Sequence, residues 1–234
     1  MLYGISPIKS VATYGAAAER IRQEITLGNF LPGAKLPAER KFSDELGVAR
    51  ITLREALKLL DSEGYFEIRR GVNGGTFIVD ELKLEEIGIA QLNKSQSACL
   101  RAMEYWRINQ VACARFAAVR RSPADLKRMR EALEALRQEP ERALRRRAES
   151  ELCLSVAAAT GNIWLADAAH DSLAASYLPF VPLMSQDQHF SLLMVEELIS
   201  SIHDHQEEQA TELMASVCET FIARFKALLI RGAI

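Results

Sequence analysis

The sequence has no long uninterrupted apolar run, although hydrophobic residues make up 49% of its 234 positions. A helix that crosses a membrane needs about 20 consecutive apolar residues, so the sequence predicts no membrane association. The segment from Met1 to Gly15 lacks a basic stretch leading into an apolar one, which argues against a secretion signal. We therefore expect a cytoplasmic protein with a packed core.

Cysteine is scarce and scattered. The four cysteines show no CxxC spacing, which argues against a disulfide framework and against a structural zinc site. We expect them to act as small buried apolar residues; they are Cys99, Cys113, Cys153 and Cys218.

The residue sets that enzymes need are also missing. We find no nucleophile accompanied by a base and an acid, and no glycine-rich phosphate loop. Both are recurring signatures of catalytic sites. The prediction is therefore a protein that is not an enzyme and has no cofactor.

Net charge gives little indication of a partner. The formal net charge is −2, whereas a nucleic-acid-binding protein usually has a basic domain. Residues 1–80 contain 11 basic and 10 acidic side chains, and the remainder contains 18 and 21. The placement of the basic residues is more informative, because several fall where one DNA-facing surface would lie; they are Lys35, Arg40, Arg50, Arg54, Arg69 and Arg70.

Three helices are predicted near the N-terminus. Apolar residues at helical spacing indicate a helix over 14–26, which the turn at 28–33 ends. A short second helix begins near Pro37 and ends at Gly47. A third runs over 48–62, with Leu53, Leu57 and Leu60 as its apolar stripe.

A β-hairpin follows the third helix. Residues 65–68 and 76–79 are rich in aromatic and β-branched side chains, and a turn of glycine, asparagine and arginine separates them. Three helices followed by a hairpin are typical of a winged helix-turn-helix, which places a helix in the major groove of DNA. We therefore expect DNA binding.

Arg50 and Arg54 lie four residues apart, so they share a helix face, and a guanidinium can bind O6 and N7 of guanine. Small side chains beside them let the helix approach the groove, and the basic glycine turn suits the minor groove or the backbone. Glu39 is expected to orient an arginine. The predicted DNA-binding residues are Lys35, Arg40, Ala49, Arg50, Ile51, Thr52, Arg54, Arg70 and Gly71.

Two alternatives to a DNA-binding surface stay open. A lone arginine pair is more often a solvated helix face bonded to acids such as Glu39, Glu55 or Asp61. A winged domain can also serve as an adaptor that binds protein. The order of the elements around the arginines favours DNA over both.

From Leu84 onward the strand signal fades and amphipathic segments repeat. They predict helices over 84–92, 97–120, 123–137, 141–160, 163–177, 190–203 and 206–229. Ser122-Pro123-Ala124-Asp125 is typical of a capped helix start, and Gly161-Asn162 of a helix end followed by a cap. The expected fold is mainly α, with a winged helix-turn-helix in 1–80, a linker and leading helix in 81–96, and an all-α antiparallel bundle in 97–234.

Residues 14–80 resemble the DNA-binding domain of the GntR family of bacterial transcription regulators. In the FadR-like branch of that family, residues at these positions contact DNA. The resemblance therefore implies DNA contacts here by Arg40, Arg50 and Arg54 and by the wing at Arg70-Gly71. The matching segments are Pro32-Gly33, Leu36-Pro37-Ala38-Glu39-Arg40, Val48 through Leu57, Glu63-Gly64 and Gly71 through Phe77.

The helical remainder is similar to the effector domain of that branch, called FCD. The resemblance implies a homodimer on a double-stranded, pseudo-palindromic operator. It also implies a small-molecule effector, bound in the helical domain, that modulates operator affinity. Whether the protein represses or activates does not follow from the residues.

Many FCD domains hold a divalent metal with one aspartate and three histidines. These positions correspond here to Glu149, Cys153, Val195 and Val217. Valine has no donor atom, so we predict no metal. The alternative is a non-standard site in which Glu149 and Cys153 are joined by a histidine, namely His189, His203 or His205.

Without a metal, a cavity lined partly by valines favours an apolar carboxylate or acyl compound as effector. Its charge would be met by Arg107; alternatively, Arg107 pairs with an acid such as Glu104 and side chains fill the cavity. The candidate effector residues are Arg107, Glu149, Cys153, Val195 and Val217.

Overall fold

The computed structural model describes residues 13–72, 74–177 and 192–231. Contacts divide the chain into two compact units. The first, which we call the N-terminal unit, comprises Met1–Arg22 and Gly33–Val79. The second, the helical unit, comprises Gln23–Pro32 and Asp80–Ile234.

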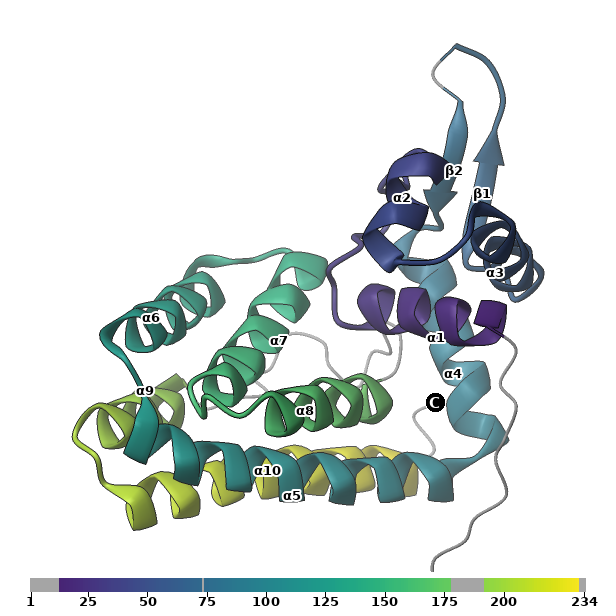
Figure 1. Ribbon diagram of the computed structural model, residues 1–234. Coiled ribbons are helices and arrows are strands. Elements are labelled where there is room, and N and C mark those ends of the chain that lie inside the picture. The colour runs from purple at the N-terminus through teal and green to yellow at the C-terminus, as the bar shows by residue number, and fades with distance from the viewer. Residues whose placement is uncertain (1–12, 73, 178–191, 232–234) are drawn as a thin grey trace, which may run out of the picture. The chain divides into compact units, whose positions relative to one another are not determined.

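The N-terminal unit contains three helices and a two-stranded hairpin (Figure 1). The strands are antiparallel, and Phe66 is paired with Ile78 and Arg69 with Gly75. The elements are α1 (Thr13–Thr26), whose last turn belongs to the helical unit, α2 (Glu39–Leu46), α3 (Arg50–Ser62), β1 (Phe66–Arg69) and β2 (Gly75–Ile78).

One face of α3 packs into the core of this unit. Leu53, Ala56 and Leu60 are completely buried at helical spacing, whereas Leu57 is only half-buried. The predicted stripe is therefore right at Leu53 and Leu60, and Ala56 rather than Leu57 completes it. Other elements supply the rest of the core, namely Ala18, Ile21, Phe42, Tyr65, Phe66 and Ile78.

Gly47 sets the turn between α2 and α3. Its φ is +65°, a left-handed conformation that costs a residue with a side chain more than it costs glycine. The N–H of Gly47 donates to the carbonyl of Asp44, and the N–H of Val48 donates to that of Ser43. These bonds end α2 and start the chain toward α3.

The helical unit consists of helices throughout its described residues. The longest two, α5 and α10, pack along one another (Figure 1). The helices are α4 (Glu81–Lys94), α5 (Gln96–Arg120), α6 (Pro123–Gln138), α7 (Arg142–Ala158), α8 (Ile163–Ser176), α9 (Leu192–His203) and α10 (Glu207–Arg231). The predicted fold class, a winged helix-turn-helix followed by an all-helical domain, is confirmed.

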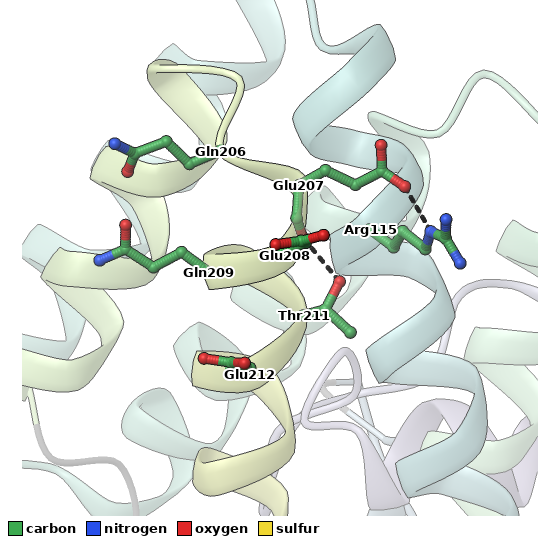
Figure 2. A pocket seen from close by; sticks show the side chains of 7 residues that line it. All are labelled: Arg115, Gln206, Glu207, Glu208, Gln209, Thr211 and Glu212. Carbon is green, nitrogen blue, oxygen red and sulfur yellow. Dashed lines mark hydrogen bonds and ion pairs between the residues drawn. The ribbon is translucent and has the colours of Figure 1, made fainter.

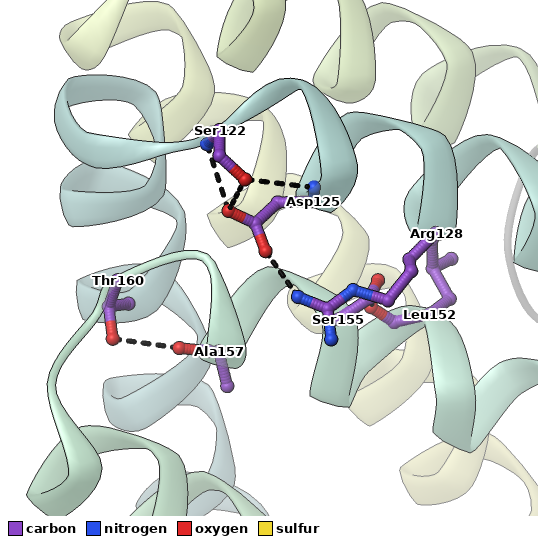
Figure 3. A network of polar contacts seen from close by, with 7 residues as sticks. All are labelled: Ser122, Asp125, Arg128, Leu152, Ser155, Ala157 and Thr160. Carbon is purple, nitrogen blue, oxygen red and sulfur yellow. Dashed lines mark hydrogen bonds and ion pairs between the residues drawn. The ribbon is translucent and has the colours of Figure 1, made fainter.

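Local capping explains where these helices begin. Ser122 and Asp125 form a capping box, with Pro123 in the first helical turn and Arg128 bonded to the Asp125 carboxylate (Figure 3). At the start of α8, the Asn162 side chain accepts the Trp164 N–H over 3.0 Å. Both caps confirm the predicted helix starts.

Hydroxyl groups also satisfy carbonyls where α7 ends. The Thr160 hydroxyl donates to the Ala157 carbonyl over 2.7 Å, and the Ser155 hydroxyl to that of Leu152 over 2.7 Å (Figure 3). The carbonyls of a last helical turn have fewer partners within the helix than those of its interior. Most of the core of the unit is apolar; Trp106 and Phe221, for example, meet edge to face with ring centroids 5.2 Å apart.

No described helix combines the length and the apolar content that crossing a lipid bilayer requires.

Candidate functional site

The exposed face of α3 carries two of the predicted DNA-binding arginines. Arg50 is its first residue and Arg54 follows one turn later, and both are exposed. Leu53 and Leu60 are buried on an adjoining face, while the side chains of the two arginines stay in solvent. The helix therefore presents cations to solvent on a rigid, packed backbone.

Arg54 is held by an acid from the preceding helix. Its Nε donates to Glu39 Oε2 over 2.7 Å, which links α3 to α2. Glu55 is bonded to Lys58 over 2.8 Å and so belongs to a different pair. Both members of the Arg54–Glu39 pair are exposed, so the pair contributes little stability, and its effect is to orient the guanidinium.

Other cations on this surface have no acidic partner. Within the described residues, the guanidinium groups of Arg40, Arg50 and Arg70 form no ion pair. The N-cap of α3 is Ala49, which offers no capping side chain. Ile51 is 65% exposed at the same end of the helix. Charge, backbone N–H groups and an apolar side chain therefore occur together at the start of α3.

The two adjacent arginines of the wing, Arg69 and Arg70, differ in their contacts. Arg69 is bonded to Glu67 over 3.0 Å and lies 4.4 Å from the centroid of the Phe77 ring, whereas Arg70 follows it into the exposed turn. Gly71 has a φ of +107° and open space around it. The wing tip therefore consists of an exposed arginine and a backbone that a ligand can approach closely.

Lys35 lies along the base of the wing. Its backbone forms an isolated bridge with Phe77, and its ammonium group lies 5.8 Å from the centroid of that ring. A Cβ added to Gly75 would come within 2.6 Å of the Lys35 side chain. Gly75 therefore makes room for the lysine, a role that the sequence did not predict.

In the helical unit, the positions aligned with the family's metal ligands are buried. Glu149 and Cys153 lie one turn apart on α7, Val195 is on α9 and Val217 on α10. Two of these four side chains have no donor atom. Within the described residues, no group of three or more His, Cys, Asp or Glu side chains could hold a metal ion. Of the four positions, only Glu149 and Cys153 could therefore donate to a metal.

The histidines of the alternative metal site lie elsewhere. His203 bonds Asp204 over 2.6 Å at the end of α9, and His205 Nδ1 lies 2.6 Å from the Ala118 carbonyl oxygen. Both residues are exposed, His203 as the last residue of α9 and His205 in the turn that follows. His189 lies outside the described residues. The described histidines therefore do not complete a site with Glu149 and Cys153.

Arg107 does not have the partner that the sequence suggested. Its Nη2 donates to Glu219 Oε1 of α10 over 2.6 Å, and its side chain is 39% exposed. The acid expected from the sequence was Glu104, which precedes Arg107 on the same helix. The bond instead joins α5 to α10 at the surface.

A different arginine lies inside the bundle. Arg146 on α7 is only 4% exposed, and its guanidinium carbon lies 4.0 Å from the centroid of the Tyr177 ring. Burial raises the pKa of the nearby Glu149 carboxyl to about 7, and the charges of Arg146 and Arg145 oppose that rise. Further buried side chains with polar atoms lie on α5 and α7, which pack against each other, and at the end of α8. We call the whole set the interior polar cluster: Trp106, Gln110, Arg146, Glu149, Ser150 and Tyr177.

Most of this cluster was not predicted from the sequence. Gln110 lies one turn after Trp106 on α5, and Ser150 lies one turn after Arg146 on α7. Polar residues in register with an apolar helix face are a signal that could have found them. That signal alone does not show that the two helices bring them together.

An open hollow of about 1060 Å³ lies where α10 begins (Figure 2). It is lined mainly by acids and amides, and Arg115 is bonded to Glu207 at its edge. The Thr211 hydroxyl donates to the Glu207 backbone carbonyl over 2.7 Å. These groups form a solvated polar surface rather than an enclosed site.

A winged helix-turn-helix with an arginine-bearing α3, followed by an all-helical unit, defines a class of two-domain DNA-binding regulators. Residues 13–78 match the family model described as bacterial regulatory proteins, gntR family, and residues 110–220 match that of the FCD domain. The chain belongs to the GntR family, in the FadR-like subfamily with an FCD domain. It is a DNA-binding transcription regulator and not an enzyme.

Known proteins agree with this assignment. The chain is 29% identical over 204 residues to a putative HTH-type transcriptional regulator, RmpR, of Mycobacterium gastri, covering 85% of this chain and 74% of that protein. It is 45% identical over 58 residues to the Exu regulon transcriptional regulator of Escherichia coli, covering 25% and 22%. The fold resembles that of E. coli McbR/YncC, with 17% identity, a TM-score of 0.53, and coverage of 93% and 99%.

Proposed function

We propose that α3 reads operator DNA in the major groove, with Arg50 and Arg54 reaching base edges. The observation that carries this proposal is the exposure of both arginines on a helix that is anchored by the buried Leu53 and Leu60. A guanidinium fork can bind O6 and N7 of one guanine, and the methyl group of thymine suits an apolar side chain such as Ile51. Ala49 and Thr52 are small enough to let α3 approach.

The remaining residues of this surface position the protein on the DNA backbone. We assign phosphate contacts to Lys35 and Arg40, and minor-groove or backbone contacts to Arg70 and Gly71. The uncapped N-terminus of α3 adds backbone N–H groups that can bind a phosphate. Each lysine or arginine that neutralises a phosphate steepens the salt dependence of binding.

The DNA-bound form that we propose is a homodimer in the bacterial cytoplasm. Two copies related by a two-fold axis would place their α3 helices in two half-sites, so the operator would be an inverted repeat. The spacing of the half-sites would then report the distance between the two recognition helices.

We further propose that the helical unit binds a small-molecule effector, an organic carboxylate or acyl compound, that changes operator affinity. Helix α7 is suited to transmit its effect. Arg142 at its start bonds Glu81 and Glu85 of α4 over 2.9 Å each, and α4 directly follows the N-terminal unit. An added Cβ on Gly28 would lie 3.0 Å from the Arg147 backbone nitrogen. Residues 23–32 and α4 both belong to the helical unit and adjoin the N-terminal unit in sequence, and both lie against α7.

A random pool of duplexes can test operator binding, because it requires no assumption about the target genes. The full-length protein would enrich sequences from this pool, and binding to the enriched sequence would be measured for wild type and for Arg50→Ala. We expect an enriched inverted repeat and a weaker, less selective variant. If no duplex sequence is enriched, or if an enriched sequence binds Arg50→Ala equally well, the proposed role of α3 is wrong. The latter result would favour a protein-binding winged domain.

A further inference from the structure

We propose that the interior polar cluster binds a small organic carboxylate directly through the guanidinium of Arg146, without a metal ion. This inference rests on the proposed effector function of the helical unit. It states how the effector would be bound, with Arg146 of α7 as the cation that meets its carboxylate. Two of the positions that the resemblance assigns to the metal, Glu149 and Cys153, follow Arg146 on the same helix, three and seven residues later.

Arg146 is a buried cation, and the Glu149 carboxyl that interacts with its charge is only partly ionised at neutral pH, because burial raises its pKa to about 7. Within the described residues Arg146 forms no ion pair, and its Nη1 has no hydrogen-bond partner. The face of the Tyr177 ring stabilises the guanidinium only in part. Removing a charge from water is costly unless an opposite charge and further hydrogen bonds compensate. A carboxylate supplies both to a guanidinium.

Other side chains of the cluster also have buried polar atoms without a hydrogen-bond partner among the described residues. Gln110 is fully buried, and neither its amide nitrogen nor its amide oxygen has a partner in the described part of the chain. The Trp106 indole nitrogen and the Ser150 hydroxyl are likewise unpaired among those residues. Burying a polar group without a hydrogen-bond partner destabilises a folded protein. Several such atoms on the two packed helices α5 and α7 indicate a site for a polar ligand.

The positions of these residues make a single site. Trp106 and Gln110 are four residues apart on α5, so they share one face; Arg146 and Ser150 are four apart on α7. Helices α5 and α7 pack against each other. Tyr177 joins the two sides, because its ring contacts Arg146 and also lies 6.1 Å from Phe221, which itself contacts Trp106.

The chemistry of these atoms selects the class of ligand. The unpaired guanidinium, indole and amide nitrogens are donors, Gln110 Oε1 is an acceptor and the Ser150 hydroxyl can be either. The charge of Arg146 is balanced only in part, because burial raises the pKa of the Glu149 carboxyl to about 7. A carboxylate has acceptor oxygens and the complementary charge. A neutral amide of the same shape lacks the charge, and a metal cation would meet Arg146 with charge of the same sign.

The test uses full-length protein that has been unfolded, dialysed and refolded to remove any bound compound, in buffer treated with 1,10-phenanthroline. Thermal unfolding would be followed with L-lactate, succinate and benzoate, each compared with its amide. We expect at least one carboxylate to raise the melting temperature while its amide does not, because a ligand that binds only the folded state stabilises it. Zinc or nickel should not be required.

Variants then locate the binding site. Arg146→Met keeps the volume of the side chain and removes its charge, and Gln110→Glu keeps Arg146 and adds a competing carboxylate. Either change should raise the apparent Kd of the stabilising carboxylate at least about 30-fold. Arg115→Gln, at an exposed arginine that bonds Glu207, should leave it unchanged. Gln110→Glu keeps the test decisive if Arg146→Met does not fold.

Three results would overturn the proposal. They are a carboxylate effect that appears only with added metal, an equal effect of the neutral amides, and no effect of any of the three carboxylates. The first two would leave the proposed effector function intact. Operator binding, measured separately on the same refolded sample, would show whether the DNA-binding function stands by itself.

Discussion

Arg54 of α3 donates from Nε to Glu39 Oε2 of α2 over 2.7 Å. The two residues are 15 positions apart in sequence, and only the turn at Gly47 brings their helices together. Since both side chains are exposed, the pair stabilises the fold by at most about 1 kcal/mol. Its consequence is geometric, because it restricts the orientation of a guanidinium on the face that we propose for DNA.

Glu39→Ala should reduce discrimination between operator and random DNA. The substitution frees Arg54 and removes one negative charge from the surface, so affinity for non-specific DNA should rise and the ratio of the two affinities should fall. Titrations of both duplexes over a range of salt concentrations measure this ratio. Glu55→Ala is the matched control, because Glu55 bonds Lys58 on the same helix. An unchanged ratio would mean that Glu39 does not position Arg54.

Arg50→Ala should weaken operator binding by about 1–3 kcal/mol and relax preference at one base pair. The guanidinium has no ion pair within the described residues, so its removal should hardly change the free energy of unfolding. Fluorescence anisotropy with a labelled operator provides the affinity. Lys41→Ala serves as control, since Lys41 pairs with Glu45 on α2. A similar loss in both variants would point to a general effect of charge.

Gly74→Ala should distort the wing. A Cβ at this position would lie 2.5 Å from the Arg69 carbonyl oxygen and 2.8 Å from that of Gly71, both backbone atoms that cannot easily move. We expect a cost of about 1–3 kcal/mol, confined to the hairpin, together with weaker operator binding. Hydrogen exchange in β1 and β2 would report the local loss. Val72→Ala, at the fully exposed tip, should leave exchange unchanged.

Asp125→Asn should destabilise the helical unit at neutral pH. Burial alone would raise the pKa of Asp125, but hydrogen bonds from the Ser122 N–H and hydroxyl and from Arg128 lower it overall. A lowered carboxyl pKa stabilises the folded state above the unfolded pKa of about 3.9, and this contribution is lost as the pH falls further. Urea unfolding at pH 7 and below pH 4 should therefore show a difference that shrinks in acid. If the two proteins differ in free energy of unfolding by the same amount at both pH values, the charge of Asp125 is not the cause of the difference.

Glu149→Gln should have the opposite pH dependence. Burial raises the pKa of Glu149 to about 7, against the charges of Arg146 and Arg145, and its neighbours Cys153 and Tyr177 are protonated at that pH. The unfolded carboxyl ionises first as the pH rises, so wild type loses stability between about pH 4.5 and 7. The variant should be more stable than wild type at pH 8, by at most about 3 kcal/mol, and little changed at pH 4.5.

The control for this comparison is Glu151→Gln on the same helix, where an exposed carboxylate bonds Arg147. That variant should show no comparable gain at pH 8. If Glu149→Gln is destabilised at every pH, the carboxylate is needed in its charged form by its neighbours.

Much of the local structure could be predicted because its causes lie within a few residues. The capping box at Ser122 and Asp125, the cap at Asn162 and the left-handed Gly47 each act within one turn of chain. The stripe on α3 shows the limit of such reasoning. Periodicity located the buried face, but whether Ala56 or Leu57 completes it depends on the angle at which neighbouring elements pack.

The amino-acid sequence by itself determined the order of elements, the winged helix-turn-helix and the arginine spacing on α3, because these follow from local backbone preferences and side-chain periodicity. Only the tertiary structure decided that Arg107 bonds Glu219 at the surface while Arg146 is buried against the ring of Tyr177. The rotation of each helix about its own axis sets which of its polar residues face inward. That rotation is fixed by the packing of all the helices together, and no single segment contains it.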